Sequence, residues 1–317
     1  MKKRYLFILA VLSFVTACMS TTTPPIQSNK KHPTEIRITP QNSAISSWAF
    51  QLQKPQLANL AESPYDLLVI DYSKDGSDSK KFSARDIAVL HKFRKTVLCY
   101  LSIGEAEDYR FYWQEEWKND PPLFLGPENP DWIGNYKVKY WREDWWEKSL
   151  RPYLDRIIEA GYDGVYLDIV DGYWFWHEQG MAVQDTADEM VKLIKRIADY
   201  ARKKAGREFI ICPQNGMGVF ADCSPEYKDV YLKTINMIGL ESLLYNTHSP
   251  EDRDYRLELA KELAESGKII LDVEYIAPSQ YAEYLQKVKA LDFKLIPYGA
   301  TPDAALDRIT DFWKFNQ

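Results

Sequence analysis

Histidine and cysteine are scarce in this sequence, and neither stands in a pattern that holds a metal. There are four histidines in 317 residues, with no HxH or HExxH spacing, which argues against the common zinc sites. The four cysteines include no CxxC pair, so no redox motif is indicated. Cys99 and Cys212 lie in apolar runs and are expected to be buried thiols, while Cys212 and Cys223 could form a disulfide. We predict no metal and no cofactor.

Motifs of several other protein classes are absent as well. No GxSxG nucleophile elbow occurs, and no GxGxxG or GxxxxGK[ST] phosphate-binding loop. No HIGH-type or KMSKS-type segment supports a nucleotide or tRNA enzyme. The chain is acidic, with 40 basic and 46 acidic residues, so nucleic acid is excluded as a partner. Acidity suits a neutral or cationic partner, although it can also serve solubility alone.

The N-terminus, MKKRYLFILAVLSFVTAC, has three basic residues followed by a short apolar run. This pattern predicts an export signal over residues 1–17. The residues VTAC resemble the lipobox of bacterial lipoproteins, which implies cleavage before Cys18 and lipidation of its sulfur; an ordinary signal peptide is the alternative. Residues 18–45 are rich in Ser, Thr and Pro and are predicted to be a flexible tether.

We therefore expect an exported protein that contacts the membrane through a lipid anchor only. Its location would be the outer membrane, the periplasm or the cell surface of a bacterium. Removal of residues 1–17 takes away three basic residues and no acid, leaving 37 basic and 46 acidic residues, a net charge of −9. The sequence predicts no oligomeric state.

Residues 46–317 are predicted to form one α/β domain, because short apolar runs alternate with amphipathic helices. The runs are mostly continuous, as in parallel strands that are covered on both faces. They are SWAFQLQ (47–53), DLLVIDY (66–72), TVLCYLSIG (96–104), GVYLDIV (164–170), FIICPQNG (209–216), INMIGLE (235–241), IILDVEY (269–275) and KLIPYG (294–299). Eight such strands predict a (β/α)8 TIM barrel, with a doubly wound open sheet as the competitor.

Capping residues mark several of the expected helices. The segment 185–206 has an Asp or Thr cap and ends at Gly206, and 249–267 has proline in its first turn and ends at Gly267. Pro302 predicts a final helix over 301–315. The connection between the third and fourth strands is long and aromatic-rich, and we expect an ordered loop beside the site, with most of its rings in a satellite core. Its tryptophans are Trp113, Trp117, Trp132, Trp141, Trp145 and Trp146.

Acidic residues recur where the predicted strands end. Parallel strands of a barrel place these ends around one rim, where several carboxylates together are costly to desolvate and therefore indicate a function. Paired carboxylates flanked by aromatic rings are typical of glycoside hydrolysis, in which one acid protonates the leaving oxygen and a second carboxylate attacks or activates water. The rim residues are Asp71, Glu105, Asp168, Asp171, Glu241 and Glu274, joined by Asn215.

Six segments also carry a family resemblance. They are YLSIGEAEDYRFYW (100–113), NPDWIGNYKVKYW (129–141), GYDGVYLDIVDGY (161–173), PQNG (213–216), IGLE (238–241) and LDVEY (271–275). Together they resemble glycoside hydrolase family 114, the endo-α-1,4-polygalactosaminidases and their relatives. The resemblance implies a TIM barrel, endo-cleavage of an α-1,4-linked polymer of galactosamine and N-acetylgalactosamine, and a catalytic pair at Asp168 and Glu241. A partly deacetylated polymer is cationic, which suits an acidic rim.

Roles within the pair are assigned by preference. Asp168 is taken as the nucleophile or stabilising carboxylate and Glu241 as the general acid/base. Their predicted strands are two apart, so their backbones are expected about 10 Å apart, which fits either a retaining or an inverting pair.

The remaining candidates have structural alternatives. Glu107 is expected to be structural and paired with Arg110, and His177 to hydrogen-bond within its loop rather than to catalyse. The others could contact substrate or could pack and cap locally. They are Asp71, Glu105, Asp171, Tyr173, Trp174, Asn215, Tyr245, Glu274 and Tyr298, with Trp176 a further stacking candidate.

Two other functions remain open. One is a non-catalytic envelope lipoprotein that binds an aminosugar polymer on the same barrel. The other is a hydrolase of a different α-linked glycan, since specificity lies in loops that vary within a fold.

Overall fold

Eight parallel strands form the centre of the protein in a computed structural model that describes residues 45–312. They follow one another in space as they do in the chain, in one sheet ordered β1-β2-β3-β7-β8 and a second ordered β9-β10-β11. Their bounds are β1 Trp48–Gln51, β2 Leu67–Ile70, β3 Thr96–Ser102, β7 Gly164–Asp168, β8 Ile210–Pro213, β9 Met237–Glu241, β10 Ile269–Tyr275 and β11 Leu295–Ala300. The prediction of an α/β fold with parallel strands is confirmed.

The two sheets approach each other at both edges. A parallel bridge joins Gln214 to Gly239, extending the contact from β8 to β9. At the opposite edge the indole of Trp48 in β1 donates to the carbonyl of Ile296 in β11, at 2.9 Å. The arrangement is therefore TIM-barrel-like, with strand neighbours in chain order.

Aromatic rings fill the space between the two sheets. Trp48 stacks on Phe50 and Tyr166, with ring centroids 6.1 and 6.3 Å apart, and lies 5.7 Å from the ring of Tyr298. All four rings are buried. A side chain at Gly239 would clash with this core, because a Cβ there would lie 2.0 Å from the hydroxyl of Tyr166.

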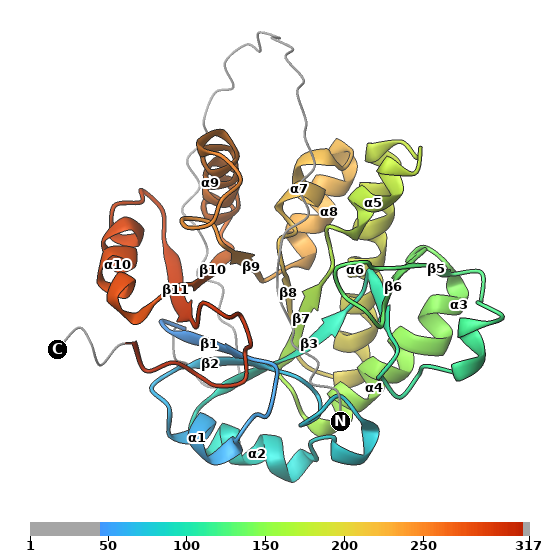
Figure 1. Cartoon of the computed structure of the whole chain (residues 1–317), viewed down its shortest axis with the longest axis horizontal. Helices are drawn as coiled ribbons and strands as arrows, with labels where there is room; N and C mark the ends of the chain where they lie inside the picture. Colours follow the sequence, from blue (N-terminus) through green and yellow to red (C-terminus); the bar gives the residue numbers. More distant parts are fainter. Residues whose placement is uncertain (1–44, 313–317) are drawn as a thin grey trace, which may run out of the picture.

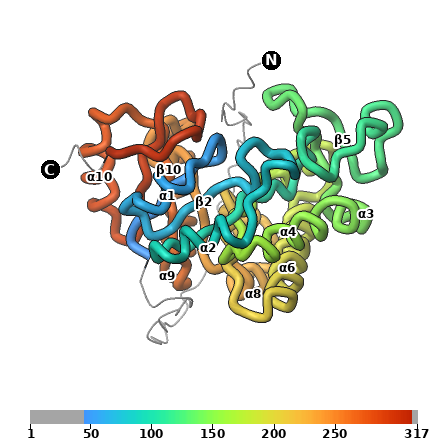
Figure 2. The backbone as a smooth tube through the Cα atoms, turned by 90° about the horizontal axis from the view of Figure 1, so that it is seen from below, coloured from blue at the N-terminus to red at the C-terminus, as the bar shows by residue number. Residues whose placement is uncertain are grey.

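Helices surround the strands (Figure 1), and the view from below shows α1, α2, α4 and α6 outside them (Figure 2). Their bounds are α1 Leu57–Glu62, α2 Ala84–Lys92, α4 Arg151–Ala160, α5 Gly172–Glu178, α6 Val183–Ala205, α7 Met217–Asp222, α8 Pro225–Thr234, α9 Pro250–Glu265 and α10 Tyr281–Lys289. Short helical turns, η1 Asp78–Lys80 and η4 Pro278–Gln280, lie in the connections. Within the described residues no helix has both the length and the apolar character needed to cross a bilayer.

The helix signals were mostly correct. Gly206 and Gly267 adopt positive φ angles of 64° and 82°, as expected after helix C-termini. Pro250 opens α9, and Ser249 accepts the backbone N–H of Asp252 as its cap. The predicted Asp or Thr cap was wrong for α6, which begins earlier, at Val183, without a side-chain cap.

The long connection after β3 is an ordered substructure, as predicted. Its antiparallel sheet has the order β4-β6-β5, with bounds β4 Glu105–Glu107, β5 Leu125–Glu128 and β6 Asn135–Val138. It also contains the helical turns η2 Glu115–Lys118 and α3 Glu143–Trp145 and the π-helical turn η3 Trp146–Leu150. Trp117, Trp145 and Trp146 are buried, while the other three tryptophans of this segment are partly exposed. Figure 1 shows β5 and α3 at the edge of the molecule.

The expected helix over 301–315 is wrong for the part that the structure describes. Residues 301–311 form turns and irregular structure, with positive φ angles at Ala304 and Leu306. The segment is held by the strands instead, since the carbonyl of Leu306 accepts the N–H of both Leu52 and Gln53. The hydroxyl of Thr310 donates to the carbonyl of Gly299 at 2.6 Å. These tertiary hydrogen bonds replace the intrahelical ones that Pro302 was expected to start.

The disulfide that Cys212 and Cys223 could have formed is not present. Both thiols, and that of Cys99, are free and buried. Burial raises the pKa of the Cys223 thiol to about 11. All three therefore behave as small apolar core residues rather than as reactive groups.

Candidate active site

Asp168 is the last residue of β7 and is held by two hydrogen bonds. The phenol of Tyr100, on the neighbouring strand β3, donates to its Oδ2 at 2.6 Å. The backbone N–H of Ile169 donates to its Oδ1 at 2.8 Å. The carboxyl group is partly exposed to solvent. Its orientation is therefore fixed while a ligand can still reach it.

The backbone turns sharply after three successive strands. Ile169, Asn215 and Ser242 follow β7, β8 and β9 with φ angles of 55°, 50° and 51°. Side chains rarely adopt this left-handed region, and a β-branched isoleucine is an outlier there. Gly104 allows the turn at Ile169, because a Cβ at Gly104 would lie 2.2 Å from the Ile169 carbonyl oxygen. Three of the eight non-glycine residues with a positive φ in the described chain thus follow the neighbouring strands β7, β8 and β9.

Glu241 is the last residue of β9 and is 8% exposed. The phenol of Tyr275, at the end of β10, makes a very short hydrogen bond to its Oε1. The side-chain amide of Asn215 donates to its Oε2 at 3.3 Å, and Asn215 Oδ1 accepts the Glu241 N–H at 3.2 Å. Arg256 binds the carbonyls of Glu241 and Ser242 at 2.7 and 3.0 Å. Every polar group of this residue is therefore held from a neighbouring strand or helix.

The two acids share one feature that single surface acids lack, a raised pKa. Burial raises the pKa of Asp168 to about 8, with the negative charge of Glu241 adding to the effect and the Tyr100 phenol opposing it. Burial also raises the pKa of Glu241, and hydrogen bonds from Tyr275, Gln214 and Asn215 oppose the rise. A raised pKa favours the protonated form of a carboxyl, which is the form that general acid catalysis requires.

A third acid of the rim, Asp171, interacts with the charge of Lys137: desolvation by the surrounding protein raises the pKa of Asp171, and the positive charge of Lys137 opposes the rise. Asp171 is exposed and immediately precedes α5. Glu105, in β4, is fully buried, and its Oε1 accepts the ammonium of Lys137 at 2.5 Å and the amide of Asn129 at 2.8 Å. Lys137 belongs to β6, directly opposite Glu105 in the antiparallel pairing. The structure thus places Glu105 beneath Lys137 rather than at the surface.

Asp71 is placed in a buried ion-pair network. Arg110, whose side chain is 1% exposed, binds Asp71 at 2.8 Å and Glu107 at 2.7 Å. The predicted pairing of Glu107 with Arg110 is confirmed. Burial raises the pKa of Asp71 to about 6, against the opposing charge of Arg110. The guanidinium also lies 5.8 Å from the ring centroid of Tyr100, so this network lies behind the residue that orients Asp168.

Glu274 points away from Glu241. In the parallel register Glu241 is level with Val273, so side-chain alternation directs Tyr275 to the face of Glu241 and Glu274 to the opposite face. There Glu274 is fully buried and accepts the backbone N–H groups of Leu244 and Tyr245 at 2.5 and 3.2 Å. Burial, with the nearby charge of Asp272, raises its pKa to about 9. Its contacts fix the loop that follows Glu241.

The remaining aromatic candidates each have a local partner. Tyr173 donates to Asp222 at 2.7 Å, and the indole of Trp174 donates to Glu178 at 3.1 Å. The Lys287 ammonium lies 3.9 Å from the ring centroid of Tyr245. The hydroxyl of buried Tyr298 accepts the N–H of Thr310 at 3.2 Å. The indole of Trp176 donates to the Val138 carbonyl, and His177 contacts the Met181 carbonyl at 2.9 Å, the loop role expected of it.

Sequence reasoning missed Tyr100, Tyr275, Gln214 and Lys137. The two tyrosines carried a signal, since each lies in a strand segment of the family resemblance. Only the strand register could show that they face the acids. Among residues 45–312, no group of three or more His, Cys, Asp or Glu side chains is arranged to hold a metal.

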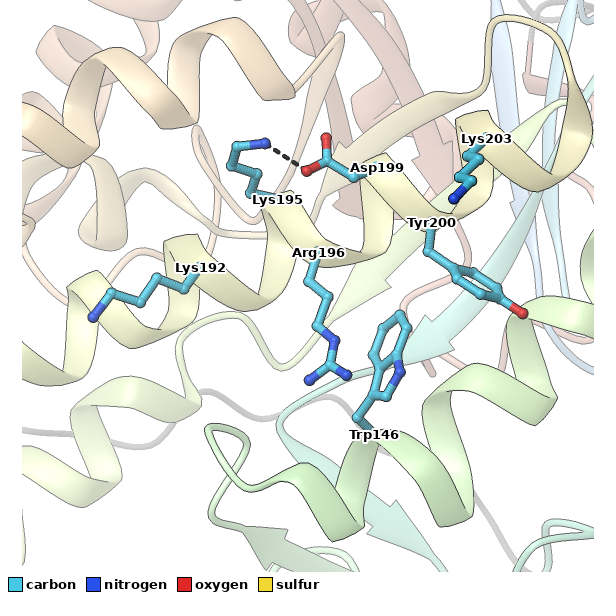
Figure 3. Close-up of a pocket in the computed structure, with 7 residues that line it drawn as sticks. All are labelled: Trp146, Lys192, Lys195, Arg196, Asp199, Tyr200 and Lys203. Atoms are coloured by element: carbon cyan, nitrogen blue, oxygen red, sulfur yellow. Dashed lines mark hydrogen bonds and ion pairs between the residues drawn. The ribbon is translucent and has the colours of Figure 1, made fainter.

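A surface hollow of about 420 Å³ lies elsewhere, on the outer helical layer (Figure 3). All its lining residues except Trp146 belong to α6. Its charges are largely paired, as between Lys195 and Asp199 at 2.5 Å. The guanidinium of Arg196 covers the Trp146 ring at 4.2 Å. It offers neither a free ring face nor an unpaired acid and is separate from the candidate active site.

Parallel strands that end in two hydrogen-bonded carboxylic acids with raised pKa values suit the chemistry of a glycoside hydrolase. The chain belongs to glycoside-hydrolase family GH114, whose family model matches residues 27–308. An uncharacterized protein of Methanocaldococcus jannaschii is 42% identical over 278 residues, which is 84% of this chain and 78% of that protein. An uncharacterized protein of Thermotoga maritima is 34% identical, over 84% of this chain and 83% of that protein.

Two solved structures share the fold. The glycoside hydrolase domain of PelA from Pseudomonas aeruginosa has a TM-score of 0.62 at 18% identity, covering 84% of this chain and 97% of that one. Aspergillus fumigatus Ega3, solved in complex with galactosamine, has a TM-score of 0.58 at 16% identity, covering 84% of this chain and 96% of that one. The expected family is thus confirmed.

Proposed function

We propose that this protein is an endo-acting hydrolase of α-1,4-linked polysaccharide that contains galactosamine and N-acetylgalactosamine. Asp168 and Glu241 are its catalytic pair. One observation carries the proposal. These two acids are 73 positions apart in the chain, yet they are the last residues of β7 and β9, two strands with only β8 between them. Each acid also accepts a hydrogen bond from a tyrosine on the strand on its other side. Membership of GH114 and the galactosamine complex of the Ega3 structure support the substrate class.

In the proposed reaction Asp168 is the nucleophile or stabilising carboxylate. Its two oxygens are fixed by the Tyr100 phenol and the Ile169 N–H, which keeps one geometry for attack on the anomeric carbon. A bound cationic sugar would favour the ionised form of this carboxyl and oppose the rise in its pKa caused by burial.

Glu241 is the proposed general acid/base. Its burial raises its pKa and so keeps the proton that the leaving oxygen needs. Tyr275 and Asn215 orient the carboxyl from opposite sides. Asp171, exposed at the same rim, is a further substrate contact, and the aromatic-rich segment after β3 borders it.

We also propose that the eight strands close into a complete (β/α)8 barrel. The Trp48–Ile296 hydrogen bond at one junction and the Gln214–Gly239 bridge at the other support closure. Closure matters for catalysis because it fixes the spacing between strand ends more rigidly than an open sheet would.

The activity is tested by incubating a purified fragment that begins at residue 19 with partly deacetylated α-1,4-galactosaminan and with a polymer of N-acetylglucosamine. Release of oligosaccharides from the first polymer alone supports the proposal. Asp168→Asn and Glu241→Gln should each lower the rate by at least about 100-fold with an unchanged circular dichroism spectrum. Binding without cleavage by the wild-type protein would instead indicate a non-catalytic aminosugar-binding protein.

The export and lipid anchor are proposed from residues 1–18, which lie outside the described residues. The basic start, the apolar run and the VTAC sequence support cleavage before Cys18. Labelling of cells with a radioactive fatty acid tests the anchor. Label that Cys18→Ala abolishes supports it, and label-free protein in the medium would oppose it.

A further inference from the structure

Lys137 brings a positive charge close to the acids of the rim. Its ammonium is bound to Glu105 at 2.5 Å, and its side chain is 17% exposed while that of Glu105 is fully buried. Among the described residues this is the hydrogen bond that the ammonium makes, whereas a lysine has three donors. The donors that remain are available at the exposed side of the pair.

Phe175 locates this ammonium relative to Asp171. The ammonium lies 5.5 Å from the centroid of the Phe175 ring. Phe175 follows Asp171 by four positions in the turn that opens α5, so the two side chains lie on one face of the helix. The backbones are also in close approach, because a Cβ at Gly172 would lie 3.5 Å from the Cα of Gly104, the residue before β4.

The Lys137 side chain is held in place from below. Glu105 uses Oε1 for both Lys137 and Asn129, and its Oε2 has no hydrogen-bond partner in the described chain. If Lys137 moved away, the buried carboxylate of Glu105 would be left without a counter-charge, which is costly in free energy. Lys137 is thus a fixed donor, not a freely moving surface lysine.

We infer that Lys137 and Asp171 form a subsite that recognises the acetamido group of an N-acetylated sugar. An acetamido group presents a carbonyl acceptor and an N–H donor on opposite sides of its planar trans amide, so a donor and an acceptor that flank it can bind both. The Lys137 ammonium can donate to the carbonyl oxygen while the Asp171 carboxylate accepts the N–H. A protonated sugar amine has donors only, so it could bind Asp171 but would meet the like charge of Lys137.

This inference rests on the proposed function and makes it more specific. The acidic rim attracts a cationic polymer as a whole, while this subsite selects an N-acetylated unit within it. Cleavage would therefore favour chains that keep acetyl groups over fully deacetylated chains. Asp71 and Glu274, which are engaged elsewhere, take no part in this selection.

The test compares the kcat/KM for re-acetylated galactosaminan with that for fully deacetylated galactosaminan. In Lys137→Gln the ratio of the two values should fall about tenfold, equivalent to about 1.4 kcal/mol. Lys137→Arg, which keeps the charge, should retain most of the ratio. Lys137→Gln alone leaves Glu105 charged and unpaired in the interior. The double variant Glu105→Gln with Lys137→Gln avoids this and should show the same fall in the ratio.

Lys139 supplies a matched control. It is two residues away, over the ring of Trp176 at 5.8 Å, so Lys139→Gln removes the same charge without touching the subsite. An equal fall in Lys139→Gln would mean that net charge alone sets the preference and would overturn the inference. An unchanged ratio in Lys137→Gln would also overturn it.

Binding separates failure of the subsite from failure of the proposed function. Calorimetry with the Glu241→Gln protein would measure binding of N-acetylgalactosamine and galactosamine oligosaccharides. A preference for the acetylated ligand that disappears with Lys137→Gln would uphold the subsite even if the wild-type protein cleaves neither polymer. Hydrolysis of both polymers with no such preference would uphold the proposed function and reject the subsite.

Discussion

Replacing Asp168 by asparagine should inactivate the protein and at the same time make its fold more stable. Asparagine keeps the size of the side chain, its oxygen can accept the Ile169 N–H, and its amide can donate to the Tyr100 hydroxyl. The substitution removes only the tendency to ionise. Active-site residues often make a fold less stable than it would be with a non-functional side chain at the same position.

The size of the gain follows from the pKa. Burial raises the pKa of Asp168 from 3.8 to about 8, so between these values the folded protein holds a proton that the unfolded chain has released. The stability that the protonated Asp168 contributes is fully present below about pH 4, and it is lost as the pH rises from about 4 to about 8. With this shift the ionisable carboxyl lowers the free energy of unfolding by about 4 kcal/mol at pH 7 and by about 1.6 kcal/mol at pH 5, relative to a side chain that cannot ionise. Partial exposure and solvent screening reduce the expected gain at pH 7 to about 1–3 kcal/mol.

Urea denaturation followed by tryptophan fluorescence would measure the free energy of unfolding at about pH 5 and about pH 7.5. The gain from Asp168→Asn should be larger at the higher pH. Asp229→Asn is the control, since this acid is 75% exposed and the change should stay within about 0.5 kcal/mol. A loss of stability in Asp168→Asn, or a gain that does not depend on pH, would refute the reasoning.

Two further substitutions test the supporting residues. Tyr275→Phe removes the phenol that stabilises ionised Glu241, so the pKa of Glu241 should rise. The limb of the pH–rate profile assigned to Glu241 should then move to higher pH by about 0.5–1 unit. An unchanged limb would show that Tyr275 does not control the ionisation of Glu241. Arg110→Met leaves Asp71 and Glu107 buried without their cation, and the free energy of unfolding should drop by about 3–5 kcal/mol, which a thermal melt would reveal. A drop below about 1 kcal/mol would show that the network is not structurally important.

The order of the parallel strands and the two candidate catalytic acids were already indicated by the sequence. Continuous Val-, Ile- and Leu-rich runs are selected by burial on both faces, and they identified all eight strands. Asp168 and Glu241 each interrupt the end of such a run. A charged residue at that place costs free energy unless its charge is paired or neutralised, which is why the sequence selected both as candidates.

The sequence left open the surroundings of acids whose partners come from distant segments. Asp71 and Glu274 resemble Asp168 in their position along the chain, yet Arg110 binds the first and the backbone beyond Glu241 binds the second. The prediction of a last helix, over residues 301–315, was wrong for a similar reason. Pro302 is a valid start signal, but the carbonyl of Leu306 accepts the backbone N–H groups of Leu52 and Gln53, which follow β1.

What the sequence determined alone was the set of parallel strands. It also predicted an export signal and two candidate acids, because each of these patterns depends on residues next to one another. Which face of a strand a side chain occupies was decided by tertiary structure. Register places Tyr275 beside Glu241 and turns Glu274 away, although the two are adjacent. The same folding brought Lys137, 34 positions from Asp171, toward that acid's helix. Hydrogen bonds and charges act over a few ångströms of space, and distance along the chain does not encode that proximity.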